Sequence, residues 1–181
     1  VLYESNSRAL SKIVLSWVPT PGITTYMVKW RQTNPVSNWS SDIVKRNDYE
    51  ILDSSAATYE INVSAQTSSL LYSQPAILTF NAQGKTAPPS DVTGLSLISI
   101  DSASAILSWD LAPDLDVRLG GKVLIRHSIL TSGATWENAQ ELVPSAAGNQ
   151  TQKQIPLLTG TVLVKFEDDT GNRSINAATA T

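Results

Sequence analysis

Apolar and polar residues alternate along most of this chain. The alternation is clear in residues 12–17, 26–30 and 59–65, where every second side chain is apolar or aromatic. A period of two predicts strands that bury one face and expose the other, as antiparallel sheets do. Turn-forming residues separate these segments, for example in residues 19–22 and 53–55. Short strands with turns at this spacing predict an all-β sandwich or barrel.

The same alternation returns in the second half of the chain. Residues 105–109 repeat the pattern of residues 13–17, in which three alternate apolar residues end on a Trp. Residues 123–127 repeat the pattern of residues 26–30 in the same way. Two matches in the same order indicate an internal repeat and not a chance similarity.

A third match completes the repeat, because the alternation of apolar residues in 59–63 returns in residues 162–166. The repeat length is about 90–100 residues, the size of one immunoglobulin-like sandwich. We therefore predict two tandem modules, residues 1–83 and 92–181, joined by a linker of residues 84–91. Its Pro-Pro pair favours extended backbone, so we expect a semi-rigid spacer that sets the modules end to end.

Composition and charge exclude several classes of partner. The chain has 181 residues, of which 41% are hydrophobic, and it has no cysteine. Disulfides and thiolate metal sites are therefore excluded, and stability must come from a packed core. The net charge of −3 gives no attraction for nucleic acid, and no apolar run approaches the ~18 residues of a membrane span. We expect no nucleic-acid partner and no membrane insertion.

The first residues include neither an initiator Met nor the layout of a signal peptide. We therefore expect this chain to be a segment of a longer protein.

The positions of several aromatic residues resemble the fibronectin type III family. Trp17 and Trp109 each end the second strand of a module, and Tyr59 begins a Tyr-x-Ile-x-Val pattern. The resemblance implies two fibronectin type III sandwiches, in which the Trp fills the core and the Tyr hydroxyl bonds to upstream backbone. Val162 stands where the second Tyr would be, so we expect that hydrogen bond to be missing, at a cost of about 1 kcal/mol. The expected structural core contains Trp17, Tyr26, Val28, Tyr59, Trp109, Ile125 and Phe166.

Five longer stretches run through both modules and the linker, namely residues 59–65, 84–95, 114–122, 157–161 and 164–174. They resemble the tandem fibronectin modules of tail tip attachment proteins of long-tailed bacteriophages. The resemblance implies a central fibre or hub protein of the virion, at the extracellular tail tip, that assembles as a homotrimer with other tail proteins. It also implies that regions outside this segment contact a host surface receptor.

Candidate catalytic chemistry is sparse. His127 is the only histidine, so a Ser-His-Asp arrangement would have to use it. Alternation places His127 on the inward face in line with Val123 and Ile125, and the chain has no Gly-x-Ser-x-Gly motif. We interpret His127 as a satisfied interior or edge histidine, and we expect no catalytic residue and no enzymatic activity.

Calcium is the one metal that the sequence leaves open. Asp110, Asp114 and Asp116 fall within one predicted loop, and Asp91 lies in the linker. Oxygen ligands at a module junction would suit Ca²⁺. The spacing matches no calcium loop motif, however, and Asp is also a common turn residue. We therefore expect no cofactor, while a calcium ion at these residues stays an open alternative.

Two loops are more apolar than solvent exposure would justify. Residues 68–72 contain Leu70, Leu71 and Tyr72, which we interpret as an interface with whatever precedes residue 1 or with a neighbouring subunit. Folding back onto their own sheet is the alternative. In residues 111–119, Leu115 and Val117 alternate with polar residues and are expected to pack where the modules join.

Residues 136–142 are the only helical candidate, with apolar residues three apart. At two turns a helix would be marginal, and a bent edge strand explains the pattern equally well.

The hypothesis from sequence is a non-enzymatic spacer and inter-subunit packing segment of a phage tail tip protein. Two alternatives belong to other classes. One is an accessory region of a secreted bacterial glycan-degrading enzyme, and the other is an adhesin module that binds protein or sugar directly.

Overall fold

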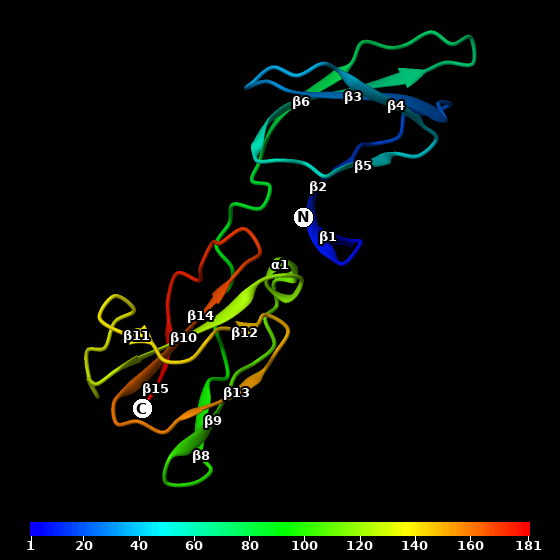
Figure 1. The fold of residues 1–181 in the computed structure, drawn as a ribbon. Coiled ribbons are helices and arrows are strands. Elements are labelled where there is room, and N and C mark those ends of the chain that lie inside the picture. Colours follow the sequence, from blue (N-terminus) through cyan, green and yellow to red (C-terminus); the bar gives the residue numbers. More distant parts are fainter. The chain divides into compact units, whose positions relative to one another are not determined.

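The computed structural model describes all 181 residues, which form two compact units. The first unit contains residues 1–3 and 10–85, and the second contains residues 4–9 and 86–181. Figure 1 draws the first unit in blue to green, and residues 86–181 of the second unit in green to red. The limits that the sequence suggests for the modules and the linker stay predictions.

Seven strands form the sheets of the first unit, and the first two of them also include some of residues 4–9. They are β1 (Leu2–Ser5), β2 (Arg8–Ser16), β3 (Thr25–Gln32), β4 (Ser40–Val44), β5 (Asp48–Leu52), β6 (Ala57–Gln66) and β7 (Ala76–Ala82). One sheet has the order β1-β2-β5 and the other the order β4-β3-β6-β7. This is the A-B-E and C′-C-F-G arrangement of a fibronectin type III sandwich.

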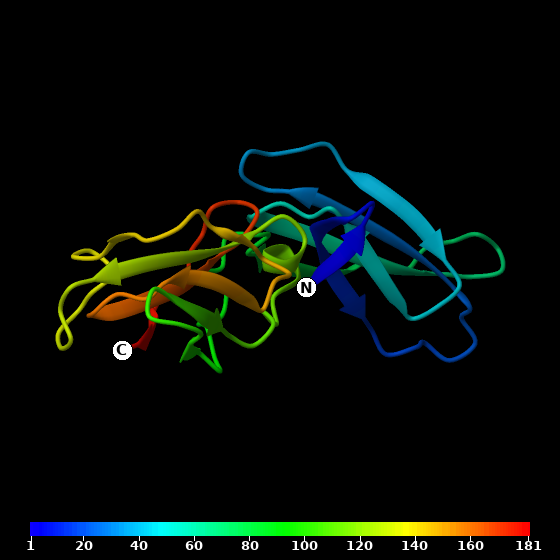
Figure 2. The ribbon, with the colours of Figure 1, turned by 60° about the horizontal axis from the view of Figure 1, so that its bottom comes forward.

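The second unit repeats that arrangement with eight strands and one helical turn. The elements are β8 (Ser96–Ser99), β9 (Ser104–Ser108), α1 (Leu115–Arg118), β10 (Lys122–Ser128), β11 (Gln140–Glu141), β12 (Ala146–Ala147), β13 (Gln152–Pro156), β14 (Thr161–Glu167) and β15 (Ala178–Ala180). One sheet has the order β13-β9-β8, and the other the order β11-β10-β14-β15 with β12 also on β10. The predicted fold class, two tandem fibronectin type III-like sandwiches, is confirmed (Figures 1 and 2).

The sequence pattern explains why these segments are strands. In β2 the side chains of Ser11, Ile13 and Leu15 are buried while their neighbours are more exposed. Such alternation satisfies a pleated strand that has one face on the core, and it does not fit a helix.

The register of the third and sixth strands corrects one sequence match. In the first unit Trp30 lies opposite Ile61, and in the second His127 lies opposite Val162. If the third strands are matched as the repeat suggests, Val162 therefore corresponds to Ile61 and not to Tyr59. The residue in the place of Tyr59 is Gly160.

Gly160 explains why the second unit has no tyrosine corner. Its φ is +128°, and a Cβ there would collide with the carbonyl oxygen of Ser128 and the ring of His127. No side chain fits at this point. In the first unit, by contrast, the Tyr59 hydroxyl accepts a hydrogen bond of 3.1 Å from the Ser55 N–H, as predicted.

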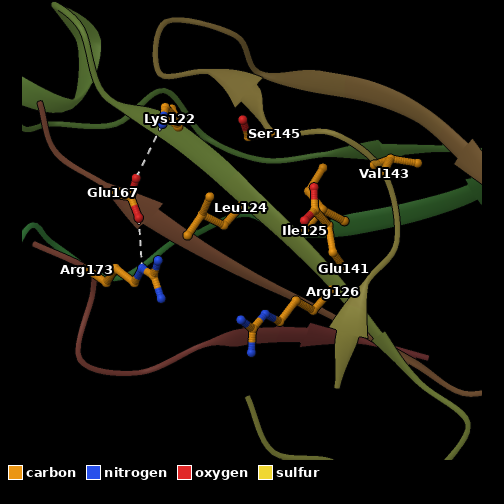
Figure 3. A pocket seen from close by; sticks show the side chains of 9 residues that line it. All are labelled: Lys122, Leu124, Ile125, Arg126, Glu141, Val143, Ser145, Glu167 and Arg173. Carbon is orange, nitrogen blue, oxygen red and sulfur yellow. Dashed lines mark hydrogen bonds and ion pairs between the residues drawn. The ribbon is translucent and has the colours of Figure 1, made fainter. Parts of the chain in front are cut away.

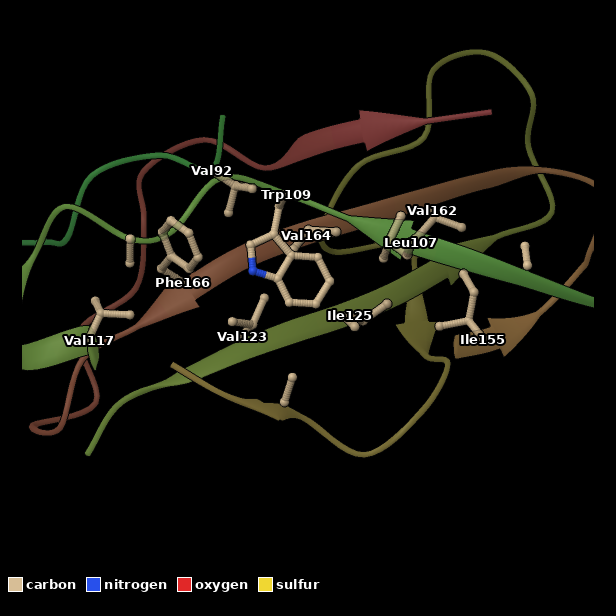
Figure 4. Close-up of a cluster of buried hydrophobic side chains, with 13 residues drawn as sticks. Val92, Leu107, Trp109, Val117, Val123, Ile125, Ile155, Val162, Val164 and Phe166 are labelled. Atoms are coloured by element: carbon tan, nitrogen blue, oxygen red, sulfur yellow. The ribbon is translucent and has the colours of Figure 1, made fainter. Parts of the chain in front are cut away.

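The two cores differ in size. The buried cluster of the second unit consists of Val92, Ala105, Leu107, Trp109, Ala112, Val117, Val123, Ile125, Ala146, Ile155, Val162, Val164 and Phe166. Figure 4 shows the Trp109 indole in the middle of this cluster. The cluster of the first unit consists of Ile13, Leu15, Val28, Ile51, Tyr59 and Ile61.

Most of the core residues named from the sequence are buried, namely Tyr26, Val28, Tyr59, Trp109, Ile125 and Phe166. Trp17 is the exception, because it is only partly buried.

Two local expectations are resolved by the structure. Residues 136–142 form turns and the short strand β11, so the edge-strand alternative is correct and the helix is not. Residues 115–118, which were expected to lie in a loop, form the short helix α1. No helix in the structure has the length and apolar character needed to span a membrane.

Candidate interaction surfaces

His127 is positioned by β10 with a backbone partner. Its Nε2 lies 3.0 Å from the carbonyl oxygen of Thr159. That contact occupies the ring nitrogen that a catalytic triad would need for its serine. The interpretation of His127 as a satisfied edge histidine is confirmed.

The aspartates proposed as calcium ligands each have their own local partners. Asp91 accepts two hydrogen bonds of 2.8 Å from Asn176, Asp110 accepts one of 2.9 Å from the Thr93 hydroxyl, and Asp114 accepts one of 2.8 Å from the Ser90 N–H. These bonds fasten the segment before β8 to later parts of the second unit. The structure brings together no group of three or more His, Asp or Glu residues that could hold a metal ion.

Asp116 and Asp168 form a buried acidic pair in the second unit. Burial, together with the negative charge of Asp168, raises the pKa of Asp116. Burial alone would also raise the pKa of Asp168, but hydrogen bonds from Asn172 and Thr170 lower it. Asp168 thus holds the 168–172 turn as an anion, while the ionised form of Asp116 is disfavoured.

A charged groove of about 260 Å³ lies on the outer face of β10 and β14. Figure 3 shows Glu167 between Lys122 and Arg173, with Nζ and Nε at 3.7 and 2.8 Å from its carboxylate oxygens. The third cation of this groove, Arg126, donates a hydrogen bond of 2.7 Å to the carbonyl oxygen of Trp136. Lys122, Arg126, Glu167 and Arg173 are therefore engaged with one another or with backbone, which favours a structural role for these four residues.

Each unit also has an Arg side chain stacked on a Trp, a contact that the sequence pattern did not predict. Arg31 lies 4.5 Å from the ring centroid of Trp39, and Arg126 lies 4.4 Å from that of Trp136. Such cation–π contacts stabilise exposed pairs by roughly 0.5–1 kcal/mol. The sequence does contain a repeated spacing here. Trp30 and His127 each lie nine positions before a Trp, and Arg31 and Arg126 are their direct neighbours.

The loop that contains Leu70, Leu71 and Tyr72 is strongly exposed. Leu71 is 68% exposed, and Leu70 has a positive φ of 60° that presents its side chain in a strained turn. The alternative that this loop folds back onto its sheet is therefore wrong. An exposed apolar loop tip of this kind is typical of an interface.

The second apolar loop behaves differently. Val117 is fully buried in the core of the second unit, and Leu115 is partly buried at the start of α1. The expectation that Val117 packs where the modules join is wrong, because α1 turns this side chain into the core of its own unit.

The comparisons with known proteins concern the fold alone. No protein-family model and no curated protein matches the chain. Among solved structures, a two-domain fibronectin type III segment of chicken tenascin is similar at 16% identity and a TM-score of 0.45, over 99% of this chain and 95% of that one. The FN1–FN3 domains of chicken CNTN1 are similar at 16% identity and a TM-score of 0.42, over 93% of this chain. The chain spans 61% of that CNTN1 structure.

Proposed function

We propose that this chain is a non-enzymatic spacer and inter-subunit packing segment of a bacteriophage tail tip or central fibre protein. The observation that carries the proposal is the run of tail-protein-like stretches, which extends through both sandwich units and the Pro-Pro segment between them. On this proposal the units act mechanically, by holding a distal receptor-binding region at a set distance.

The partners that fit this role are other copies of the chain, in a homotrimer, and other tail proteins at the virion tail tip. The exposed side chains of Leu70, Leu71 and Tyr72 support an interface between copies, because burial of such a cluster stabilises association. Receptor contact is assigned to regions outside this segment.

The experiment is Leu71→Asp in the complete parent fibre protein, with native mass spectrometry as the measure of assembly. We expect the assembled fraction to fall about tenfold or more, since a charge would be buried at the interface. Ile175→Asp is the matched control, because Ile175 is equally exposed at 73% but lies in the second unit. Unchanged assembly of the Leu71 variant would contradict the interface.

The gene neighbourhood of the parent protein tests the class. A tail-assembly cluster is the expected result, and a gene outside any phage or prophage contradicts the proposal. A glycan array probed with the 181-residue chain separates the spacer from the adhesin, because a spacer gives no specific binding.

A further inference from the structure

One outer sheet face of the second unit carries no charged side chain. In β9 the side chains of Ala105 and Leu107 are buried, so those of Ser104, Ile106 and Ser108 point outward. Residues directly opposite one another in an antiparallel pair point to the same side. The residues of β8 and β13 that lie opposite these three are Ser96, Ile98, Gln152, Gln154 and Pro156. We call this outward surface of the β13-β9-β8 sheet the neutral face.

Two charged residues lie near the neutral face in sequence, but neither lies on it. Lys153 of β13 is opposite the buried Leu107, on the inner side, and its Nζ donates a hydrogen bond to the carbonyl oxygen of Pro144. Asp101 lies in the turn between β8 and β9, where its carboxylate accepts hydrogen bonds from the N–H and the hydroxyl of Ser104. Asp101 therefore marks one end of the neutral face.

The first unit has charges at the matching positions. The internal repeat and the pairing of the second strand with the fifth give the correspondence. Where the first unit has Lys12, Asp48 and Glu50, the second has Ser104, Gln152 and Gln154. In the first unit, Lys12 and Glu50 form an ion pair of 2.7 Å. The second unit has lost all three charges from the same places in the sheet.

The other sheet of each unit is also charged on its outer side. Lys122, Arg126 and Glu167 lie on the outer side of β10 and β14. In the first unit, Arg31 of β3 and Glu60 of β6 lie opposite each other and form an ion pair of 2.6 Å. Of the four outer sheet faces in the two units, only the neutral face lacks charge.

The chemistry of the neutral face fits a second copy of the same face. A strongly acidic or basic partner would find no opposite charge there. Gln amides and Ser hydroxyls both donate and accept hydrogen bonds, so two copies of the face can satisfy each other. Residues 86–181 contain ten Asp and Glu against six Lys and Arg, so contact through charged surfaces brings excess negative charge together. Ile98 is 61% exposed and would lose its contact with water.

We propose that the neutral face is the surface through which the second units of two copies of this chain meet. Ile98 and Ile106 of one copy pack on the neutral face of the other, and the Gln amides around them form hydrogen bonds across the contact. Depletion of charge at the centre of such a contact is the usual composition of a protein interface. The inference rests on the proposed function only in that copies of the chain assemble, and it names the face that they share.

The size of the neutral face determines how the contact acts. Three strands of about five residues cover roughly 14 by 17 Å, or about 240 Å². A stable interface buries about 800 Å² on each partner. The neutral face therefore adds to an assembly in which other contacts hold the copies together, and it does not hold a dimer by itself at low concentration.

Chemical crosslinking tests the contact cleanly, because the chain has no cysteine of its own. The 181-residue chain is fused after Thr181, through a flexible Gly-Ser linker, to a trimeric coiled coil, which raises the local concentration of copies to about millimolar. Ile106→Cys on the neutral face is compared with Val14→Cys, the matching position of the first unit, which is 51% exposed. Facing sheets lie about 10 Å apart, so the reagent is a short bismaleimide.

We expect Ile106→Cys to give at least about five times more crosslinked dimer than Val14→Cys on denaturing gels. Each yield is divided by the reactivity of the same cysteine with a monofunctional maleimide, which corrects for the lower exposure of position 106. Ile98→Cys, at the more exposed edge of the neutral face, provides a second site in case the Ile106 variant does not fold.

A charge placed on the neutral face should disrupt the contact. Gln154→Glu should lower the crosslinking yield of Ile106→Cys about fivefold or more, because unpaired carboxylates would be buried between the two copies. The fold accepts Glu at this place, since Glu50 occupies the matching position of the first unit. Gln140→Glu is the matched control, because it adds the same charge to the exposed strand β11 of the other sheet. It should change the yield less than about twofold.

Three results would overturn the proposal. One is equal crosslinking of the Ile106 and Val14 variants, and another is a yield that Gln154→Glu leaves unchanged. The third is found with a chain that carries both cysteines. Preferential links between position 106 of one copy and position 14 of another would show that the neutral face packs on a first unit.

These outcomes are distinct from the failure of the proposed function. A parent gene outside any phage would remove the tail role and leave the crosslink between neutral faces intact. Absence of the crosslink would instead leave a tail spacer whose copies meet through other surfaces.

Discussion

Trp17 and Trp109 occupy the same place in the internal repeat, yet their surroundings differ. Trp109 is 4% exposed, and its Nε1 donates a hydrogen bond of 2.8 Å to the carbonyl oxygen of Gln150. Trp17 is only partly buried, packs edge-on against Tyr26 at 5.4 Å, and has a buried Nε1 with no hydrogen-bond partner. The same fold therefore encloses its core fully in the second unit and incompletely in the first.

The difference teaches that strand order does not by itself determine how well a sandwich is packed. The second unit has the larger buried cluster, which includes Val117 from α1 and Ala146 from β12. Stability per unit should follow the area removed from water, at roughly 25 cal/mol per Å². The second unit should therefore be the more stable one.

The two phenylalanines test this comparison with the largest expected effect. Phe166→Ala should destabilise the second unit by about 3–5 kcal/mol, because Phe166 is 1% exposed and its loss leaves a cavity. Phe80→Ala, in the half-exposed position of β7, should cost the first unit less than about 1.5 kcal/mol. Chemical denaturation with hydrogen exchange resolved by segment measures both. Similar losses of stability for the two variants would mean that Phe80 is as well buried in solution as Phe166.

The tryptophans give the next largest difference. Trp109→Phe should destabilise the second unit by about 1–3 kcal/mol, because the Gln150 carbonyl loses its donor and the core loses volume. Trp17→Phe should be nearly neutral, since it removes a buried N–H group that has no acceptor. Thermal unfolding monitored by circular dichroism is the measurement. A large loss for the Trp17 variant would show that its indole has a partner in solution.

The tyrosine corner should have a smaller effect, confined to the first unit. Tyr59→Phe removes the hydroxyl that accepts from the Ser55 N–H and should cost about 1 kcal/mol. Exchange of the Ser55 amide should accelerate, while that of β14 stays unchanged. Acceleration in both units would indicate global instead of local loosening.

The smallest effect concerns pH and the second unit. Because the pKa of Asp116 is raised in the folded state, folding takes up a proton between the ordinary and the raised pKa. The Asp116 contribution to stability therefore falls as pH rises through that interval and stays unfavourable above it. Asp116→Asn should raise the unfolding midpoint at pH 7 and leave it unchanged well below the ordinary Asp pKa. Unfolding curves at several pH values check this, and equal shifts at all values would contradict it.

Asp168 should behave in the opposite way, and it serves as the control. Its pKa is lowered by hydrogen bonds from Asn172 and Thr170, so its contribution is present at neutral pH. That contribution is lost as pH falls through the lowered pKa. Asp168→Asn should therefore be destabilising at pH 7, where Asp116→Asn is stabilising.

The fold could be predicted because it depends on local alternation. Period-two patterns such as residues 59–65 give strands wherever one face is buried, and the repeat gave the number of sandwiches. The residue in the place of Tyr59 could not be predicted from the pattern. Shifting the match between the two units by two residues leaves every side chain on the same face of its strand, so the alternation cannot detect the shift. Only the pairing of His127 with Val162 shows that Gly160 stands in the place of Tyr59.

The surfaces were harder to predict, because they depend on which segments meet. Val117 follows a strand-like alternation, but α1 buries it, and nothing in a run of three alternate apolar residues distinguishes these outcomes. The exposed Leu71 was predicted, since its loop connects two strands and has no face to bury. The exposure of Leu78 and Phe80 was not predicted, because both look like ordinary inward residues of a last strand.

The exposed β7 edge has a consequence for the solution behaviour of this segment. β7 has the sequence AILTFNA, without a single charge, and its only proline neighbour, Pro75, lies just before the strand. Natural proteins usually protect such edges with Lys, Pro or a bulge, because an uncharged edge can recruit further strands. A preparation of these 181 residues should therefore aggregate slowly at high concentration through β7. A single Thr79→Lys substitution, on the outer face of the strand, should keep it soluble.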